Sequence, residues 1–203
     1  MMYRQLNESE KEVLIKNGCS ADNWENIRVK EDFNPAYVKN VEFSGNISLG
    51  TFTREFDQAG GFKVHSGIFD VRLHNVSVGD DCYIHSVHNY IANYNISNDV
   101  FIENTNLIVV DGESTFGNGV RVPVMNETGG REVPIYDYLC APLAYILTMY
   151  RHDTELVEKL EEMINVYTEK QRSSVGYIGC NVKIVNCGSI KNVRIGDYAT
   201  LGG

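Results

Sequence analysis

Positive charge is scarce in this chain. Its 203 residues include 18 Lys and Arg against 27 Asp and Glu, which gives a formal net charge of −9 at pH 7 and an isoelectric point near 5.0. Nucleic acids are bound by clustered Lys and Arg, and no basic patch stands out in the sequence. We therefore expect no nucleic-acid partner.

Long apolar runs are also lacking. No stretch approaches the roughly 20 apolar residues that span a bilayer as a helix. The first residues carry neither a long apolar run nor the Lys- and Arg-led start of a signal region. We therefore expect no membrane partner and predict a soluble, cytoplasmic protein.

Paired cysteines and the common catalytic motifs are missing too. The five cysteines are odd in number, and no two of them have CxxC spacing. We expect neither a disulfide framework nor a zinc site, and no metal is predicted. The chain has no P-loop, GxSxG, HExxH or Rossmann pattern, and no nucleotidyltransferase domain precedes the repeats described next.

What the chain does contain is a short repeat. An aliphatic or aromatic residue is followed by Gly or a polar substitute, then by two mostly polar residues, then by a small or aliphatic residue. The copies are Val78–Cys82, Ile96–Val100, Phe116–Val120, Ile178–Val182 and Ile195–Ala199, with a weaker one at Leu49–Phe52.

This repeat is typical of the hexapeptides of a left-handed parallel β-helix. The first residue of each hexad is expected to point into a narrow core, and so is the residue four places later. The residue directly after the aliphatic one is expected to turn the corner, where Gly, Asn and Asp tolerate positive φ. Val78 and Ile96 lie 18 residues apart, which is three hexads or one full coil.

An antiparallel sandwich or barrel is the alternative fold for short strands with frequent turns. The glycines at the second hexad position and the 18-residue period favour the β-helix instead. We therefore predict a mainly β fold: a left-handed parallel β-helix with an N-terminal helical cap and an inserted helical hairpin. The expected segments are a cap at 1–37, β-helix at 38–125, an insertion at 126–174 and resumed β-helix at 175–203.

The insertion contains the clearest helix of the chain. Asp153 is a suitable N-cap, and Leu156, Leu160, Ile164 and Tyr167 follow at helical spacing. A second helix is predicted from about Ala141 to Tyr150. We expect the apolar stripe to pack on the β-helix or on a neighbouring subunit. A smaller interruption at 53–64 predicts a loop or short hairpin.

The whole chain resembles an uncharacterised family of hexapeptide-repeat proteins from gut-type Bacteroidetes. Members of that family are longer, so the resemblance implies an N-terminal fragment of a longer chain. It transfers no catalytic residue. The stretches that carry it are Val64–Gly67, Leu73–Val76, Asn89–Tyr94, Asn126–Glu132 and Asn192–Thr200.

At a coarser level the hexads resemble those of trimeric hexapeptide acyltransferases and of sugar nucleotidyltransferases with a β-helix domain. The resemblance implies a homo-oligomer, with a trimer favoured. It also implies an acyl-CoA such as acetyl-CoA as donor, a sugar or nucleotide sugar as acceptor, and a His as general base. A fold does not by itself fix a function.

Histidine is the side chain whose proton affinity suits such a base. His65 and His74 are the preferred candidates, because both lie close to the interruption at 53–64, which could form a pocket wall. His85 and His88 take less suitable hexad positions. A solvated or hydrogen-bonded surface role is the ordinary alternative for each of them.

The second candidate site is the polar stretch from Asn126 to Glu132. Gly129 and Gly130 free backbone N–H groups for an anion, and Arg131 can contact a phosphate, so these three are the predicted donor-binding residues. Asn126 and Glu127 are the predicted substrate-binding residues. The alternative is a hinge in which Arg131 pairs with a nearby Glu. The many asparagines predict side-chain amide ladders between stacked coils.

Two functional hypotheses follow. The first is a hexapeptide-repeat transferase that moves an acyl group from acyl-CoA to a sugar or nucleotide sugar. The second is a non-catalytic β-helix that serves assembly or ligand binding, or forms part of a sugar nucleotidyltransferase-like protein. A cleft lined by His65 or His74 would distinguish the two.

Overall fold

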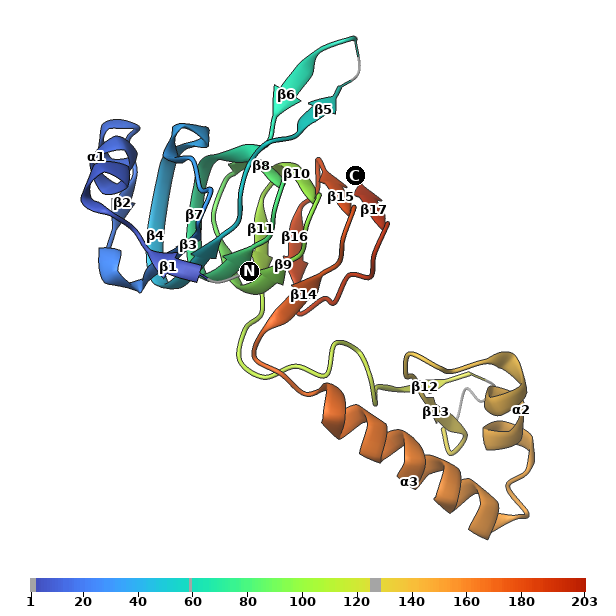
Figure 1. Ribbon diagram of the computed structural model, residues 1–203. Helices are drawn as coiled ribbons and strands as arrows, with labels where there is room; N and C mark the ends of the chain where they lie inside the picture. The colour runs from blue at the N-terminus through green and yellow to red at the C-terminus, as the bar shows by residue number, and fades with distance from the viewer. Residues whose placement is uncertain (1–2, 59, 125–128) are drawn as a thin grey trace. The chain divides into compact units, whose positions relative to one another are not determined.

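The computed structural model describes residues 3–58, 60–124 and 129–203. Two compact units make up the chain, and each is described by itself. The first unit comprises Met1–Asp111 and Val175–Gly203, and the second comprises Gly112–Ser174. The fold is mainly β, and thirteen strands of the first unit join one sheet in which most pairs are parallel (Figure 1).

The elements of the first unit are mostly short strands. They are β1 Tyr3–Gln5, α1 Glu8–Lys16, β2 Ser20–Ala21, η1 Trp24–Asn26, β3 Ile27–Lys30, η2 Pro35–Tyr37, β4 Val38–Leu49, β5 Glu55–Asp57, β6 Lys63–His65, β7 Gly67–Val78, β8 Tyr83–Val87, β9 Ile91–Ile96, β10 Phe101–Thr105, β11 Leu107–Val109, β14 Gly176–Ile178, β15 Lys183–Val185, β16 Ser189–Lys191 and β17 Thr200–Gly202.

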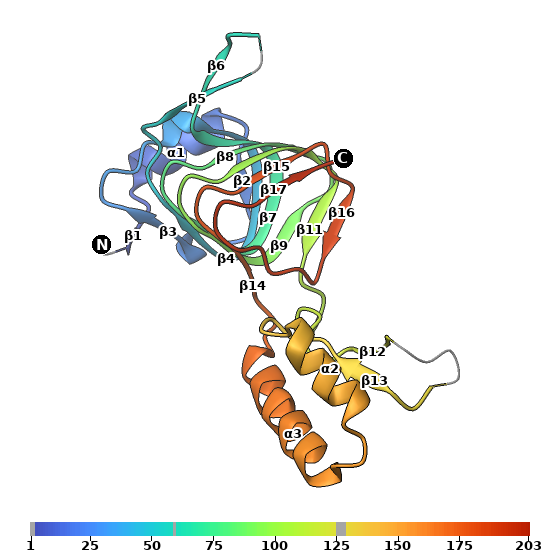
Figure 2. The same ribbon diagram turned by 90° about the vertical axis from the view of Figure 1, so that its right-hand side faces the viewer.

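The strands of this unit stack around a common interior (Figure 2). Their parallel register aligns apolar residues of successive passes into three rows. The first row is Val38, Ile68, Ile84, Ile102, Ile184 and Leu201. The second row is Phe43, Leu73, Ile91, Ile108 and Ile190. The third row is Val29, Leu49, Val78, Ile96, Ile178 and Ile195.

Every row residue except the half-buried Leu201 is buried. The predicted parallel alignment of Val78 with Ile96 is confirmed. The predicted inward positions in the copies Val78–Cys82, Ile96–Val100 and Ile178–Val182 are buried as well, and so is Ile195. The repeat thus predicts the core of the first unit, because each pass of the chain brings the same residue type to the same place.

The corners differ in register from the prediction. The residue with positive φ lies two places after the row residue in the first and second rows, as at Asp70 and Asn75, and three places after it in the third row, as at Asp81. Gly79, directly after Val78, is required for a different reason. A Cβ there would lie 2.7 Å from the backbone carbon of Ser97 and 2.5 Å from Asn98 Oδ1, so this glycine permits close approach of the next pass.

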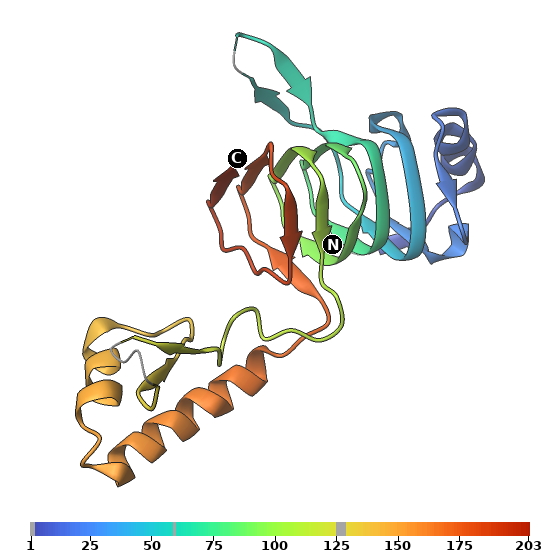
Figure 3. The ribbon, with the colours of Figure 1, turned by 180° about the vertical axis from the view of Figure 1, so that it is seen from behind.

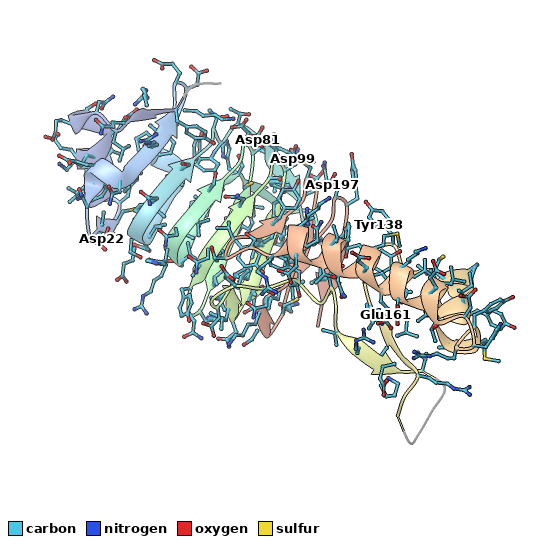
Figure 4. The ribbon with its side chains drawn as sticks, turned by 90° about the horizontal axis from the view of Figure 1, so that it is seen from below. Asp22, Asp81, Asp99, Tyr138, Glu161 and Asp197 are labelled. Carbon is cyan, nitrogen blue, oxygen red and sulfur yellow. The ribbon has the colours of Figure 1, made fainter. Side chains whose placement is uncertain are left out.

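The asparagines stack along the corners, and the predicted amide ladders are confirmed at several places. Asn104 Nδ2 donates to Asn186 Oδ1 at 2.7 Å, and Asn89 Nδ2 donates to Asn106 Oδ1 at 2.7 Å. Asp81 and Asp99 occupy successive corners of the third row and lie side by side along one edge of the unit (Figure 4). Short polar side chains at these positions both tolerate the left-handed backbone and link consecutive passes.

The N-terminal segment combines the expected helix with strands that already belong to the sheet. A capping box at Asn7 and Glu10 starts α1. β2 and β3 pair in parallel with β4, and β1 pairs antiparallel with β3. α1 lies at the end of the unit opposite to β17 (Figure 3).

The interruption at 53–64 contains an antiparallel hairpin of β5 and β6, so the prediction of a loop or short hairpin is confirmed. Phe56 anchors the hairpin, with its ring centroid 5.4 Å from that of Phe101 and 6.4 Å from that of Tyr83. Arg54 pairs with Asp99, and its guanidinium lies 4.8 Å from the Phe56 ring centroid. The hairpin therefore covers aromatic side chains on the outer face of β8 and β10.

The second unit is a small α+β module. Its elements are β12 Arg121–Pro123, β13 Glu132–Pro134, α2 Ala141–Met149 and α3 Thr154–Gln171. The two predicted helices are confirmed, and the Asp153 side chain accepts from the Leu156 amide as an N-cap. An antiparallel bridge joins the ends of the unit, where Ser114 and Ser173 exchange two backbone hydrogen bonds of 2.9 Å.

Two expectations about this unit need correction. The apolar stripe of α3 packs inside the second unit itself, where Val157 and Ile164 contact Leu147 of α2 and Val133 of β13. The hexad at Phe116 is not a core hexad, since Phe116 is half-buried and Val120 is 54% exposed. It belongs to the second unit and pairs with no pass of the sheet in the described residues, so nothing aligns it with a row.

Candidate functional site

A polar groove of the first unit lies on the surface between the first and second rows. It has a volume of about 350 Å³. Its lining residues are Gly18, Ser20, Asn40, Val41, Glu42, Asp70, Val71, Arg72, Val87, His88 and Asn89. We call this the 70/88 groove. Sequence reasoning did not place a site here.

A mismatch in segment length opens the groove. Leu73 follows Phe69 by four residues in β7, whereas Ile91 follows His85 by six in the next pass. The pairing between the two passes therefore stops at Phe69 and His85 and resumes only at Leu73 and Ile91. Between these points the pairing is interrupted, and this interruption forms one side of the groove, whose lining continues across β7 to Glu42 and Ser20.

Charges of both signs line the 70/88 groove. Arg72 Nε donates to Glu42 Oε2 at 2.8 Å, which holds the guanidinium at one wall. Asn40 Nδ2 donates to Asp70 Oδ1 at 2.9 Å. The lining thus carries two carboxylates and one guanidinium, so the groove does not favour a strongly anionic ligand.

The longer segment contributes His88 and Asn89. His88 Nε2 lies 2.9 Å from Asn104 Oδ1, and Asn104 donates its own amide to Asn186. Because Asn104 Oδ1 can only accept, Nε2 carries the proton and Nδ1 of a neutral His88 is left as an acceptor. Asn89 uses its amide nitrogen on Asn106, which leaves its Oδ1 as a further acceptor.

His85 lies beside the groove, between two carboxylates. Its Nε2 is 3.4 Å from Asp70 Oδ2, and its Nδ1 is 3.8 Å from Glu103 Oε1. The ring lies near the Tyr83 ring, at a centroid distance of 5.8 Å. Burial, followed by the charges of Glu103 and Asp70, raises the pKa of Tyr83 above its ordinary value. Through Asp70, this cluster adjoins the 70/88 groove.

His65, a predicted base, ends β6 and stacks on Tyr37. The ring centroids are 3.8 Å apart, and the interplanar angle is 7°. His65 Nδ1 lies 2.8 Å from the Ser66 carbonyl oxygen. A carbonyl only accepts, so Nδ1 is the protonated nitrogen and Nε2 of the neutral ring holds a lone pair that can take a proton.

His74, the other predicted base, is exposed on β7 and has partners at both nitrogens. Its Nε2 lies 3.0 Å from Asn75 Nδ2, which can only donate, and its Nδ1 lies 2.8 Å from Ser44 Oγ. The Asn75 amide therefore occupies the lone pair that a base would use. Neither His65 nor His74 lines the 70/88 groove.

The predicted anion site lies in the second unit. The Gly130 amide donates to Glu132 Oε1 at 2.8 Å, and this bond is the main cause that lowers the pKa of Glu132. A carboxylate already holds one of the two amides proposed for a phosphate. Arg131 is exposed. Asn126 and Glu127, the predicted substrate-binding residues, lie outside the described residues.

Metal-binding clusters and membrane-spanning helices are both missing from the described residues. In residues 3–58, 60–124 and 129–203, no group of three or more His, Cys, Asp or Glu side chains is arranged to hold a metal ion. No helix in the same ranges is both long and apolar enough to span a membrane. All five cysteines are free thiols, and burial raises the pKa of Cys82 to about 12.

Comparison with known proteins places the chain in a family without an assigned activity. No solved structure matches it. It is 28% identical over 205 residues to a protein of Treponema pallidum (strain Nichols) described as uncharacterized, in an alignment that covers 96% of this chain. The chain spans only 28% of that relative's length. The model of the family described as "Domain of unknown function (DUF4954)" matches residues 3–203, so this chain belongs to the DUF4954 family.

Proposed function

We propose that the first unit is a left-handed parallel β-helix built from hexapeptides. Three observations support this architecture: the three apolar rows, the separations of 16 and 18 residues from Ile68 to Ile84 and from Ile84 to Ile102, and the positive-φ residues at recurring corners. A crystal structure with a right-handed coil would overturn it.

We propose that the 70/88 groove binds a neutral, polyhydroxylated ligand of the size of a simple sugar. The mixed lining carries this proposal. Arg72 and Asn40 supply donors, whereas Asp70, Glu42 and Asn89 supply acceptors. Sugar hydroxyls both donate and accept, so they suit such a surface better than a phosphate does. The volume of about 350 Å³ falls within the range of small-molecule sites.

Binding of a sugar places this chain within the alternative hypothesis of a ligand-binding β-helix. It also fits the acceptor side of acyl transfer to a sugar or nucleotide sugar. The predicted homo-oligomer, with a trimer favoured, and the cytoplasmic location remain predictions. So does a role as one part of a sugar nucleotidyltransferase-like protein.

The test of the sugar proposal is titration of the protein with monosaccharides, followed by ¹H–¹⁵N NMR. We expect saturable shifts at Asp70, Arg72 and Asn89. Replacing Arg72 with Gln should weaken binding by at least about tenfold, because a hydrogen bond to a charged donor contributes roughly 1.5–3 kcal/mol. Arg28, an exposed arginine on β3 outside the groove, gives the matched control Arg28→Gln. Equal affinities of the two variants would remove the groove from the site.

Acyl transfer is the second candidate, and the lone pair on His65 Nε2 favours it. In this reaction the acceptor O–H or N–H gives its proton to Nε2. The freed electron pair then attacks the thioester carbonyl of acyl-CoA, the C–S bond breaks, and the leaving thiolate takes the proton back. Gly129, Gly130 and Arg131 of the second unit remain predicted donor-binding residues, which are tested separately.

The second candidate is tested by release of free CoA from acetyl-CoA in the presence of a sugar. We expect His65→Gln to abolish release, whereas His74→Gln should leave it unchanged. Arg131→Ala should weaken the binding of acetyl-CoA, which calorimetry measures independently of the reaction. Sugar binding without any release of CoA would contradict acyl transfer and support the ligand-binding function.

A further inference from the structure

Helix α3 of the second unit has two apolar faces, and one of them is exposed. Val157 and Ile164, on the covered face, belong to the cluster around Val133. On the other face Met163 and Val166 are 49% and 51% exposed. They line a surface groove of about 490 Å³, which we call the α3 groove. Its lining residues are Lys159, Glu162, Met163, Val166, Tyr167 and Lys170.

The exposed face has the spacing of a coiled-coil seam. Intervals of three, four, three and four residues separate Leu156, Lys159, Met163, Val166 and Lys170. This alternation keeps one line of side chains on the same face of the helix over about 21 Å. Lys159 and Lys170 can contribute their aliphatic stems while their ammonium groups reach water. A second helix laid along the seam can therefore pack its own apolar side chains against Met163 and Val166.

One flank of the seam is acidic. Glu155, Glu162 and Glu169 recur every seven residues, each directly before a seam position. This flanking position sets the choice of partner in coiled coils through its charge. Glu155 pairs with Lys159 and Glu169 pairs with Arg172, whereas Glu162 makes no ion pair within the described residues. The groove thus offers the Glu162 carboxylate to a Lys or Arg of the partner.

The other flank of the seam is aromatic. Glu162 precedes Met163 by one residue and Tyr167 follows it by four, so the two flank Met163 on opposite sides of the helix. The Tyr167 ring centroid lies 5.3 Å from that of Tyr138, which is 70% exposed. Tyrosine rings attract Lys and Arg side chains. Both flanks therefore favour positive charge on the partner.

A second copy of α3 does not fit this pattern. In a parallel pair, Lys159 and Lys170 would each face their own copies across the seam. In an antiparallel pair, the flank of Glu155, Glu162 and Glu169 would face its own copy. Like charges repel in both arrangements. We propose that the α3 groove binds an amphipathic helix of a partner protein whose apolar stripe is flanked by Lys and Arg.

The test uses two synthetic helical peptides of the length of α3 as probes. Both carry Leu at the seam positions, and the flanking positions are Lys in one peptide and Glu in the other. Fluorescence anisotropy measures their binding to the full chain. We expect saturable binding of the Lys peptide and at least about tenfold weaker binding of the Glu peptide. Added salt should weaken binding of the Lys peptide, because it screens the exposed charges.

Matched variants locate the binding face. Met163→Gln removes apolar contact from the seam and should weaken binding of the Lys peptide about fivefold or more. Ile15→Gln, at an exposed isoleucine of α1 in the first unit, should leave it unchanged. Glu162→Lys should reduce or reverse the preference between the peptides, whereas Glu12→Lys at an exposed position of α1 should not.

Each contrary outcome overturns the proposal. Equal binding of the two peptides, or binding of neither, would contradict selection by charge. Binding of the Lys peptide that Met163→Gln leaves unchanged would reflect general attraction to a chain of net charge −9. Self-association that Met163→Gln abolishes would assign the face to a second copy. The comparison of the peptides uses the unaltered chain, so it holds even where a variant unfolds.

Discussion

The two units of this chain bury their apolar side chains in different ways. The first unit places them in rows, so that Ile68, Ile84 and Ile102 occupy equivalent positions in successive passes. The second unit gathers Val133, Leu147, Val157 and Ile164 around one centre, from one strand and two helices. A row can be predicted from the sequence because its residues recur at a regular spacing. The residues around a single centre recur only at the helical period within each helix, so the sequence does not show which elements pack together.

The difference also appears on the surface. The second unit exposes large apolar side chains such as Tyr138 at 70%, Tyr145 at 56% and Met163 at 49%. A small unit buries a smaller share of its chain than a large one. We therefore expect the first unit to be the more stable of the two, and the following experiments test that ranking.

The largest effect is expected in the middle of the first row. Ile102 is fully buried between Ile84 and Ile184. Ile102→Ala should cost about 4 kcal/mol, because the paired passes on both sides restrict collapse around the cavity. Urea unfolding followed by Trp24 fluorescence measures this, since the only tryptophan of the chain lies in the first unit. A loss below about 1 kcal/mol would mean that the row relaxes freely.

A glycine pair separates crowding from backbone conformation. Gly79→Ala in the first unit should cost about 2–3 kcal/mol, because the new Cβ would lie 2.7 Å from a Ser97 backbone atom. Gly117→Ala in the second unit meets no atom within 4 Å, but it must adopt a φ of +88°, so we expect about 1–2 kcal/mol. Equal costs would argue against close approach as the role of Gly79.

The second unit should tolerate truncation of its helix better. Leu160 packs at the margin of the Val133 cluster and is only partly buried. Leu160→Ala should cost about 1–2 kcal/mol, which is below the range for fully buried leucines. The change should appear in helical circular dichroism and leave the Trp24 transition unchanged. A simultaneous shift of both transitions would show that the two units unfold together.

The smallest effect is expected from pH. Burial acts to raise the pKa of Asp80, but the Lys30 ammonium at 2.5 Å and the bonds from Thr51 outweigh it and lower the pKa below its ordinary value. A carboxyl with a lowered pKa stabilises the fold above the unfolded pKa and loses that contribution as pH falls through the folded pKa. Stability of the first unit should therefore decline below about pH 4.

Asp80→Asn should flatten this decline, and Asp57→Asn at an exposed hairpin position serves as the control. Glu10 adds to the same decline, because its hydrogen bond from Arg4 lowers its pKa. A decline that Asp80→Asn leaves unchanged would assign the acid sensitivity to other carboxyls.

The sequence predicts the rows, the hairpin and both helices, because each depends on a local pattern. It misplaces the corners because a glycine can serve either positive φ or close approach, and Gly79 serves the second. The sequence also wrongly assigns Phe116 to the core of the first unit. A single hexad has the same residue pattern whether or not it pairs with a neighbouring pass of the sheet. No local sequence pattern predicts the 70/88 groove, because it depends on the difference in length between two segments. Ile91 follows Ile84 by seven residues, whereas Leu73 follows Ile68 by five. This difference in separation is the signal that reveals the groove.

The bridge between Ser114 and Ser173 has a consequence for how this chain tolerates change. The entropy lost on closing a loop grows only with the logarithm of its length, and here the ends of the long excursion are already joined by two hydrogen bonds. The bridge therefore makes the effective connection between β11 and β14 short, whatever the length of the segment beyond it. The segment from Phe116 to Arg172 behaves as a cassette, and another folded module or a tight turn can take its place at little entropic cost to the rows.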